Sequence, residues 1–249
     1  MSTHPNRILY TFKISHYAEK ARWALDRKAL PYREETVLIG PGQVLLKLRT
    51  GSRQVPVLDD GGHMVPGSTA ILEHLDRRYP TAPLWPEDPA ARAEVKSLVG
   101  WIDERIGKGV RGYLLAQARH NKRLGFGAKV AQVVGPAVLG VASDYFGYES
   151  LDRAQEEFPK DLRELAARLV GNDFLIGDRF GAADLTAASL LNALYAPVGS
   201  PLRSRFNSHR PGIAKDRELT PLFDWLDRMY RDHRRARPVA DYGTPSSAT

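Results

Sequence analysis

The stretch that decides the fold is RILYTFKISHYAEKARWALDRK, residues 7–28. Its first part, residues 7–12, is a short apolar run with aromatic residues toward its end, which predicts a buried β-strand. From Ser15 to Lys28 the spacing changes, because Ala18 and Leu25 fall on one face of a helix. The sequence therefore predicts a strand that leads directly into a helix.

The remainder of the first 80 residues continues this alternation of strands and helices. Pro31 ends the first helix, and the breaker Gly40-Pro41-Gly42 interrupts the chain again. Turn residues at 59–62 predict a hairpin between two short strands. The expected elements are a strand at 32–38, a helix at 43–49, strands at 55–58 and 63–65, and a helix from Ser68 to Tyr79. This order fits one compact α/β unit.

A proline-rich connection separates this unit from a longer second half. Residues 80–86 contain three prolines, which cannot continue a helix and indicate a stiff linker. Beyond it we find helical patterns and no credible strand pair. The expected helices are 89–121, 127–145, 151–170, 182–194 and 221–235. We therefore predict an α/β domain at 1–80, a linker at 81–86, an all-helical domain at 87–237 and a disordered tail at 238–249.

Composition excludes several classes of function. The chain has no cysteine, so disulfides, thiolate metal sites and cysteine nucleophiles are excluded, and any reacting thiol must belong to a ligand. The seven histidines have no metal-ligand spacing, so we expect no metal site. The net charge of +7 is spread along the chain without a basic stripe, so we expect no nucleic-acid partner. With no signal peptide and no apolar run of spanning length, we expect a cytoplasmic protein without a membrane partner.

Ser15 lies where the first strand gives way to the first helix. At that junction a hydroxyl sits beside free backbone N–H groups and the positive end of the helix dipole. Such a place stabilises an anion, and it would shift the pKa of a bound thiol, normally about 8.5, toward the thiolate form. Serine is also a preferred N-cap that requires no function, so the residue alone leaves both interpretations open.

The arrangement of motifs resembles the cytosolic glutathione transferase superfamily, in its Ser-type bacterial form. In that family an activating hydroxyl follows the first strand, as Ser15 does here. Val55-Pro56 resembles the family's cis-proline signature, and Gly67–Leu72, GSTAIL, resembles the start of its third helix. Residues 174–184, FLIGDRFGAAD, resemble the capping motif of its helical domain. The resemblance covers roughly residues 7–195.

The resemblance implies a thioredoxin-like N-terminal domain followed by an all-helical C-terminal domain. It also implies a detoxifying glutathione transferase, in which Ser15 activates the thiol of bound glutathione for attack on a small hydrophobic electrophile. Tyr10, near the phenol of Tyr-type relatives, is the alternative activating residue, although a strand aromatic packed in the core is an equal reading. A homodimer is implied by the family alone. The implied glutathione contacts are Gln54, Val55, Pro56 and Ser68.

Some positions depart from the family pattern or are interpreted structurally. Gly67 stands where the family usually has an acidic residue, which favours weak glutathione binding and leaves a non-catalytic scaffold as the alternative function. Asp184 is expected to cap a helix rather than to bind substrate. We expect the electrophile to lie between the domains, lined by Trp101, Tyr113 and Leu114 or by residues 133–141.

Overall fold

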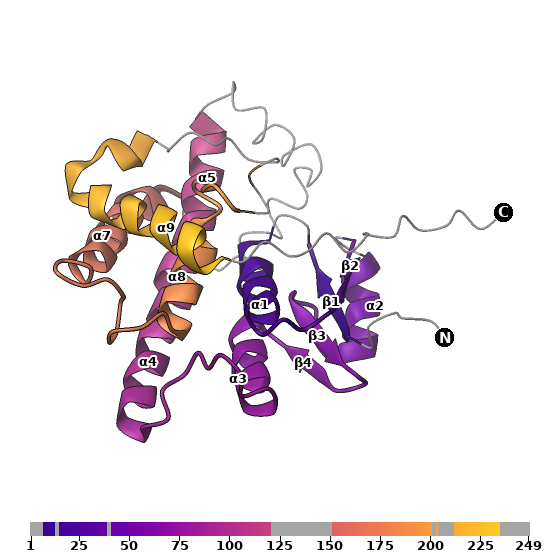
Figure 1. Cartoon of the computed structure of the whole chain (residues 1–249). Helices are drawn as coiled ribbons and strands as arrows, with labels where there is room; N and C mark the ends of the chain where they lie inside the picture. The colour runs from indigo at the N-terminus through magenta and orange to yellow at the C-terminus, as the bar shows by residue number, and fades with distance from the viewer. Residues whose placement is uncertain are drawn as a thin grey trace.

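The computed structural model describes residues 7–12, 15–38, 41–120, 151–200, 203 and 212–234. Within these residues the chain forms an α/β unit followed by a helical unit (Figure 1). The elements of the α/β unit are β1 (Arg7–Thr11), α1 (His16–Arg27), β2 (Arg33–Thr36), α2 (Pro41–Thr50), β3 (Val57–Asp60), β4 (Met64–Pro66) and α3 (Ser68–Arg78).

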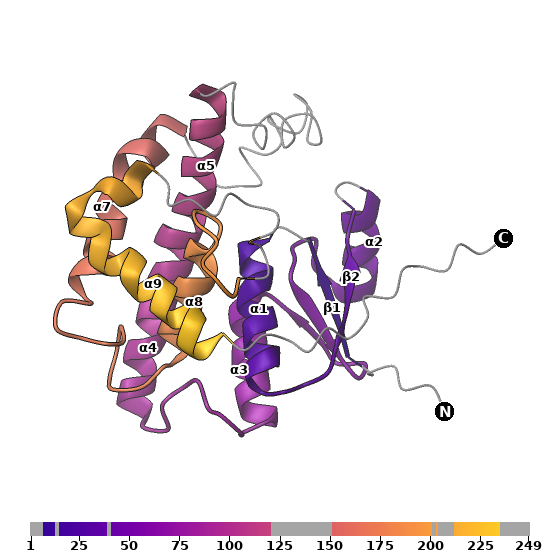
Figure 2. The same ribbon diagram turned by 45° about the horizontal axis from the view of Figure 1, so that its top comes forward.

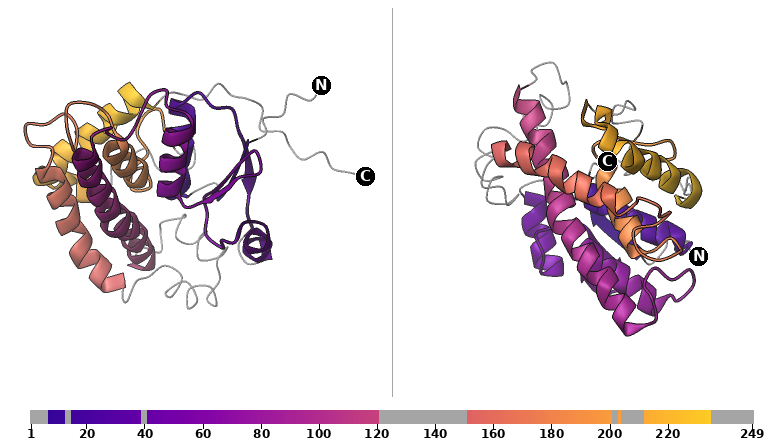
Figure 3. Two further views of the ribbon diagram at one scale, coloured as in Figure 1. Left: turned by 90° about the horizontal axis from the view of Figure 1, so that it is seen from below. Right: turned by 90° about the vertical axis from the view of Figure 1, so that its left-hand side faces the viewer.

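A single four-stranded sheet organises the α/β unit, with the strand order β2-β1-β3-β4. β1 pairs parallel with β2 and antiparallel with β3, and β3 pairs antiparallel with β4. α1 and α3 pack together on the side of the sheet that faces the helical unit, and α2 lies on the opposite side (Figure 3, left). This arrangement confirms the predicted thioredoxin-like fold.

The segment before β3 differs from the predicted strand at 55–58. The Val55–Pro56 peptide bond is cis, and the strand begins only at Val57. Pro56 has no N–H to donate to a ladder, which explains why the strand cannot begin earlier. At the far end of the hairpin, Gly67 is the N-cap of α3 and Ser68 is the first helical residue. Gly67 has a φ of 93°, which favours glycine.

The helical unit begins at Pro89, and every described element beyond β4 is helical. The predicted helix at 89–121 is interrupted by a π-helical turn that its periodicity did not indicate. The predicted helix at 127–145 and the predicted tail at 238–249 lie outside the described residues. The elements are α4 (Pro89–Trp101), the π-turn η1 (Ile102–Gly107), α5 (Lys108–His120), α7 (Leu151–Ala167), α8 (Ala182–Leu191), the 3₁₀ turns η2 (Gly212–Lys215) and η3 (Arg217–Leu219), and α9 (Thr220–His233).

One continuous apolar core joins the two units. α1 packs against α8, so that it lies between the sheet and the helical unit (Figure 2). The buried ring of Trp23 in α1 contacts the rings of Phe180 and Tyr230. No helix among the described residues is both long enough and apolar enough to cross a bilayer.

Charged side chains are buried at the same junction. The guanidinium of Arg234, directly after α9, donates from Nε to Glu19 over 2.8 Å and from an Nη to Asp26 over 2.8 Å. The side chains of Arg234 and Glu19 are 4% and 0% exposed. The end of the helical unit is therefore tied to the first helix of the α/β unit by paired charges as well as by apolar contacts.

Candidate functional site

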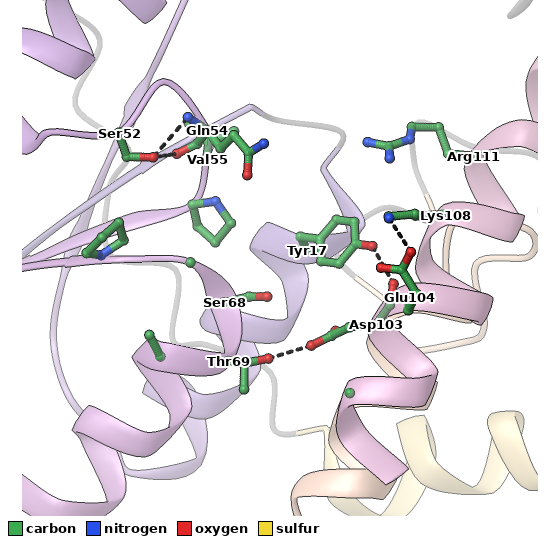
Figure 4. A pocket seen from close by; sticks show the side chains of 15 residues that line it. Tyr17, Ser52, Gln54, Val55, Ser68, Thr69, Asp103, Glu104, Lys108 and Arg111 are labelled. Carbon is green, nitrogen blue, oxygen red and sulfur yellow. Dashed lines mark hydrogen bonds and ion pairs between the residues drawn. The ribbon is translucent and has the colours of Figure 1, made fainter. Parts of the chain in front are cut away.

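A cleft of about 670 Å³ lies between the two units (Figure 4). One wall, which we call the first wall, comes from the loop before β3, the end of β4 and the start of α3. The opposite wall, which we call the helical wall, comes from α4, η1 and α5, and Tyr17 of α1 lies between them. The first wall consists of Ser52, Gln54, Val55, Pro56, Pro66, Gly67, Ser68, Thr69 and Ala70, and the helical wall of Gly100, Asp103, Glu104, Lys108 and Arg111.

The N-terminus of α3 opens into the cleft. The first intrahelical bond runs from the Ile71 N–H to the Gly67 carbonyl over 3.0 Å, so the N–H groups of the three preceding helical residues remain unused by the helix. Ser68, Thr69 and Ala70 all line the cleft. Ser68 is buried, and its hydroxyl has no hydrogen-bond partner among the described residues. Together these groups form a site suited to a carboxylate.

The loop before β3 presents backbone polar groups to the same space. The Pro56 carbonyl accepts the Gly67 N–H over 3.0 Å, which fixes the loop against the start of α3. Within the described part of the chain, nothing bonds the backbone N–H or carbonyl of Val55. Gln54 extends its side-chain amide into the space between the walls (Figure 4). An extended peptide-like ligand could pair with this edge.

Ser15 is the N-cap of α1. Its hydroxyl oxygen accepts the Ala18 N–H over 3.2 Å, and its own N–H donates to the Phe12 carbonyl over 3.1 Å. Ser15 is half-buried and is absent from the residues that line the cleft, whereas Tyr17, in the first turn of the same helix, does line it. Ser15 therefore lies at the helix start next to the cleft rather than within its walls.

Tyr10, the alternative activating residue, occupies a different environment. Its side chain is buried in a small apolar cluster with Val37, Leu46 and Val57, on the side of the sheet that α2 covers. Tyr10 does not line the cleft. This position agrees with the reading of Tyr10 as a strand aromatic packed in the core.

Sequence reasoning missed both the charged residues of the helical wall and the buried lysine of α1 that supports them. Lys20 of α1 has a fully buried ammonium that donates to the Thr69 hydroxyl over 2.6 Å and to both oxygens of Asp103 over 2.9 Å. Burial lowers the pKa of Lys20, and the Asp103 charge opposes that shift. The Asp103 side chain is 25% exposed and faces the cleft, so its contact with Lys20 ties both walls to α1.

The start of α1 contacts the π-turn directly. The Tyr17 hydroxyl donates to the Asp103 carbonyl over 2.8 Å. Nε2 of His16 lies 3.1 Å from the Gly107 carbonyl oxygen, so Nε2 is the nitrogen that carries the proton. Burial, with the charge of Arg111 as the second cause, lowers the pKa of His16 to about 4. His16 is therefore neutral near pH 7.

The expected lining of the electrophile site is wrong for the described residues. Trp101, Tyr113 and Leu114 pack against the core and are absent from the cleft lining. The Tyr113 ring centroid, for example, lies 5.5 Å from that of Phe158. The sequence signal that could have indicated the helical wall was the row of polar residues at helical spacing from residue 103 to 111. Such a row also indicates a helix face that is exposed to solvent. Residues 133–141 lie outside the described residues.

The last candidate residue, Asp184, has a structural role. Asp184 accepts the Leu175 N–H over 2.8 Å and the N-cap Gly181 N–H over 2.9 Å, which caps α8. Burial raises the pKa of the Asp184 carboxyl to about 6. No group of three potential metal-ligating side chains occurs in the residues that the structure describes.

Comparisons with known proteins agree with this geometry. Residues 9–83 match the glutathione S-transferase N-terminal domain, and residues 148–228 match the C-terminal domain. FtsZ-localized protein A of Caulobacter vibrioides is 27% identical over 192 residues, which cover 76% of this chain and 77% of that protein. Mouse glutathione S-transferase theta-2 is 28% identical over 224 residues, 88% of this chain and 77% of the mouse protein. The theta-class enzyme of Xanthomonas axonopodis pv. citri, solved with glutathione bound, superposes with a TM-score of 0.63 at 20% identity and covers 94% of this chain and 99% of its own. The chain therefore belongs to the cytosolic glutathione transferase superfamily.

Proposed function

We propose that the protein is a Ser-type glutathione transferase that joins the thiol of glutathione to a hydrophobic electrophile held between its two units. The observation that carries this proposal is the first wall of the cleft. It combines three N–H groups at the start of α3 that the helix does not use with the backbone of Val55, to which no described residue is hydrogen-bonded. These groups match the γ-glutamyl carboxylate and the peptide backbone of glutathione. Gln54 is the proposed contact for the glycyl end.

Ser15 is the proposed activating residue. Its oxygen already accepts the Ala18 N–H, so the hydroxyl proton is left to donate to sulfur. The helix dipole and this O–H would stabilise a thiolate. The thiol proton leaves to solvent, the thiolate forms a carbon–sulfur bond to the electrophile, and the leaving group departs with its bonding electrons. Proximity and thiolate stabilisation supply the rate.

Gly67 supports a second candidate function, a scaffold that binds without turnover. A side chain at this position would have space, because an added Cβ meets no atom within 4 Å, but the φ of 93° disfavours any residue other than glycine. Because glycine stands at this position, the acidic residue that the family usually places near the glutathione amino group is missing. The similarity to a protein named FtsZ-localized protein A is consistent with this second candidate.

A conjugation assay separates these functions. The wild type is compared with Ser15→Ala and with Tyr10→Phe, which removes the alternative phenol while it keeps the buried ring. We expect Ser15→Ala to lower kcat about 100-fold and Tyr10→Phe to retain the wild-type rate. Equal and negligible rates for all three proteins would favour the scaffold. A loss confined to Tyr10→Phe would assign activation to the phenol.

Calorimetric titration with glutathione tests binding separately from turnover. The transferase requires saturable binding that Ser15→Ala leaves nearly unchanged, since the hydroxyl acts mainly on sulfur. No detectable heat at millimolar glutathione would reject the first wall as a glutathione site. A cytoplasmic, detoxifying homodimer remains part of the proposal. Light scattering on the purified protein would test the dimer.

A further inference from the structure

We propose that the outer face of α2 docks the protein on an anionic lipid surface, with apolar side chains entering the edge of the bilayer and basic side chains against the lipid phosphates. This surface is separate from the cleft, and the inference does not depend on the proposed catalysis. The expectation that the protein has no membrane partner rested on the absence of a spanning segment, and a peripheral contact needs none.

Large apolar side chains are exposed together at α2. Among the described residues, four of the six exposed large apolar side chains lie within residues 38–48. They are Leu38, Val44, Leu45 and Leu48, which are 71%, 50%, 59% and 78% exposed. The other two, Val170 and Val198, lie apart from each other in the helical unit. Single exposed apolar residues are ordinary on a protein surface, whereas a cluster of them indicates an interaction site.

The exposed side chains form one strip along the helix, which we call the α2 strip. At about 100° per residue, Val44, Leu48 and Leu45 fall within an arc of about 100°. Leu38 lies against the first turn of α2, since a Cβ on the helical Gly42 would lie 3.2 Å from the Leu38 Cβ. On the opposite side of the helix, Leu46 is 3% exposed and packs in the apolar cluster beneath it. One face of α2 therefore anchors the helix to the sheet and the other faces solvent.

Basic side chains border the α2 strip on both sides. On the same helical projection, Lys47 falls about 60° before Val44, and Arg49 falls about 40° beyond Leu45. All four of these side chains are exposed. The helix itself, PGQVLLKLRT, contains no acidic residue.

The charge around the α2 strip is predominantly positive. Lys47 and the exposed Arg53, in the loop after α2, form no ion pair with any residue that the structure describes. Arg49 lies 3.7 Å from Glu35, and the same carboxylate also contacts Arg33 over 3.3 Å. Four cations therefore share one exposed carboxylate, so the surface favours an anionic partner.

An anionic bilayer fits this arrangement better than a second copy of the chain does. Two copies that met through α2 would bring their basic borders together, and like charges repel. A helix that lies in a bilayer surface has apolar side chains on one face and lysine or arginine along its borders, where the long stems reach the lipid phosphates. The net charge of +7 attracts the whole molecule to the same surface. Because α2 lies on the side of the sheet away from the helical unit (Figure 3, left), a flat surface can approach it.

Sedimentation with lipid vesicles tests the proposal on the full-length protein. The vesicles consist of phosphatidylcholine alone, or of phosphatidylcholine with about one third phosphatidylglycerol, which supplies the negative charge. We expect the partition coefficient of the wild type to be about tenfold or more higher for the anionic vesicles at low salt. High salt should remove most of this difference, because it screens the attraction between the basic borders and the phosphates.

A pair of matched variants tests whether the α2 strip is responsible. Leu45→Gln/Leu48→Gln keeps every charge and should lower the partition coefficient for anionic vesicles about tenfold. Val170→Gln/Val198→Gln is the control, because these side chains are 74% and 70% exposed but lie away from α2. The control should bind like the wild type. Both variants should melt at the wild-type temperature, since all four side chains are exposed.

A third variant tests the basic borders. Lys47→Gln/Arg53→Gln retains the α2 strip and should also lower the partition coefficient for anionic vesicles about tenfold, with little change for neutral ones. Wild-type binding that is absent, or equal for the two kinds of vesicle, would overturn the proposal. Undiminished binding by Leu45→Gln/Leu48→Gln would also overturn it, because net charge alone would then be sufficient. If the wild type ignores vesicles and this variant changes from dimer to monomer in light scattering, the α2 strip belongs to a second copy instead.

Discussion

The buried charge cluster at the end of α9 gives a sharp test of how the two units are held together. In Arg234→Met the guanidinium is lost, while Glu19 and Asp26 lose their 2.8 Å partners. Glu19 is completely buried, and its remaining cation, an Arg22 Nη, lies 3.8 Å away. Removal of one member of a buried pair costs about 3–5 kcal/mol, because the other charge stays desolvated. We expect a loss in this range near pH 7.5.

The loss should depend on pH in a defined direction. Burial raises the pKa of Glu19 above 4.5, and Arg234 opposes that shift. Without Arg234 the folded-state pKa rises further, so the folded protein takes up a proton that the unfolded chain releases above pH 4.5. The penalty of Arg234→Met is therefore small near pH 4.5 and grows as the pH rises toward the new folded pKa.

Urea unfolding followed by tryptophan fluorescence provides the assay, since the Arg234 guanidinium lies 5.6 Å from the Trp23 ring centroid. Arg231→Met is the control, because Arg231 is 67% exposed and, among the residues that the structure describes, forms an ion pair only with neighbouring Asp232. Glu19→Gln/Arg234→Met should regain most of the lost stability and lose the pH dependence. A midpoint of Arg234→Met equal to that of the control, or a double variant no more stable than the single one, would refute this reasoning.

Two further predictions concern the contact between α1 and the π-turn. His16, with its pKa lowered from 6.5 to about 4, stabilises the fold above pH 6.5, and this contribution is lost as the pH falls toward 4. Between pH 7.5 and 4.5 the wild type should lose about 2.5 kcal/mol more than His16→Gln in urea unfolding, and parallel curves would contradict the assignment. A Cβ on Gly107 would lie 2.2 Å from the Tyr17 hydroxyl oxygen, whereas one on Gly100 would meet nothing within 4 Å. Gly107→Ala should therefore lower the melting temperature and displace Tyr17 from the cleft, with slower conjugation, while Gly100→Ala melts like the wild type.

The sequence predicted the parts of this protein that depend on local spacing. The change from strand to helical periodicity between residues 7 and 28 was sufficient to predict β1 and α1. The resemblance of Val55-Pro56 to the family's cis-proline signature correctly indicated a cis bond, which the local pattern alone does not predict because most X-Pro bonds are trans. The predicted start of α3 at Ser68 is also confirmed, whereas its N-cap, Gly67, was not identified from the local pattern.

The missed features of the cleft depend on residues that are distant in the sequence. Lys20 and Asp103 are 83 positions apart, and nothing in either neighbourhood indicates that the ammonium will be buried against that carboxylate. The helical wall was missed for the same reason. Charged side chains at helical spacing predict a solvent-exposed helix face, and the sequence does not show that the first wall lies opposite them. The electrophile site was therefore assigned to Trp101, Tyr113 and Leu114, which pack against the core, or to residues 133–141, which lie outside the described residues.

The π-turn between α4 and α5 also determines which side chains of α5 face the cleft, because it fixes the rotation of α5 about the helix axis relative to α4. Each residue of an α-helix turns the chain by about 100°, and a π-turn inserts the equivalent of one extra residue. Deletion of a single residue within Ile102–Gly107 would rotate Lys108 and Arg111 together by roughly that angle relative to α4. Cations could then leave the cavity without any substitution of the cations themselves. An insertion or deletion in this short segment would therefore change which α5 side chains line the cleft, and with them the substrate preference, without any substitution in α5.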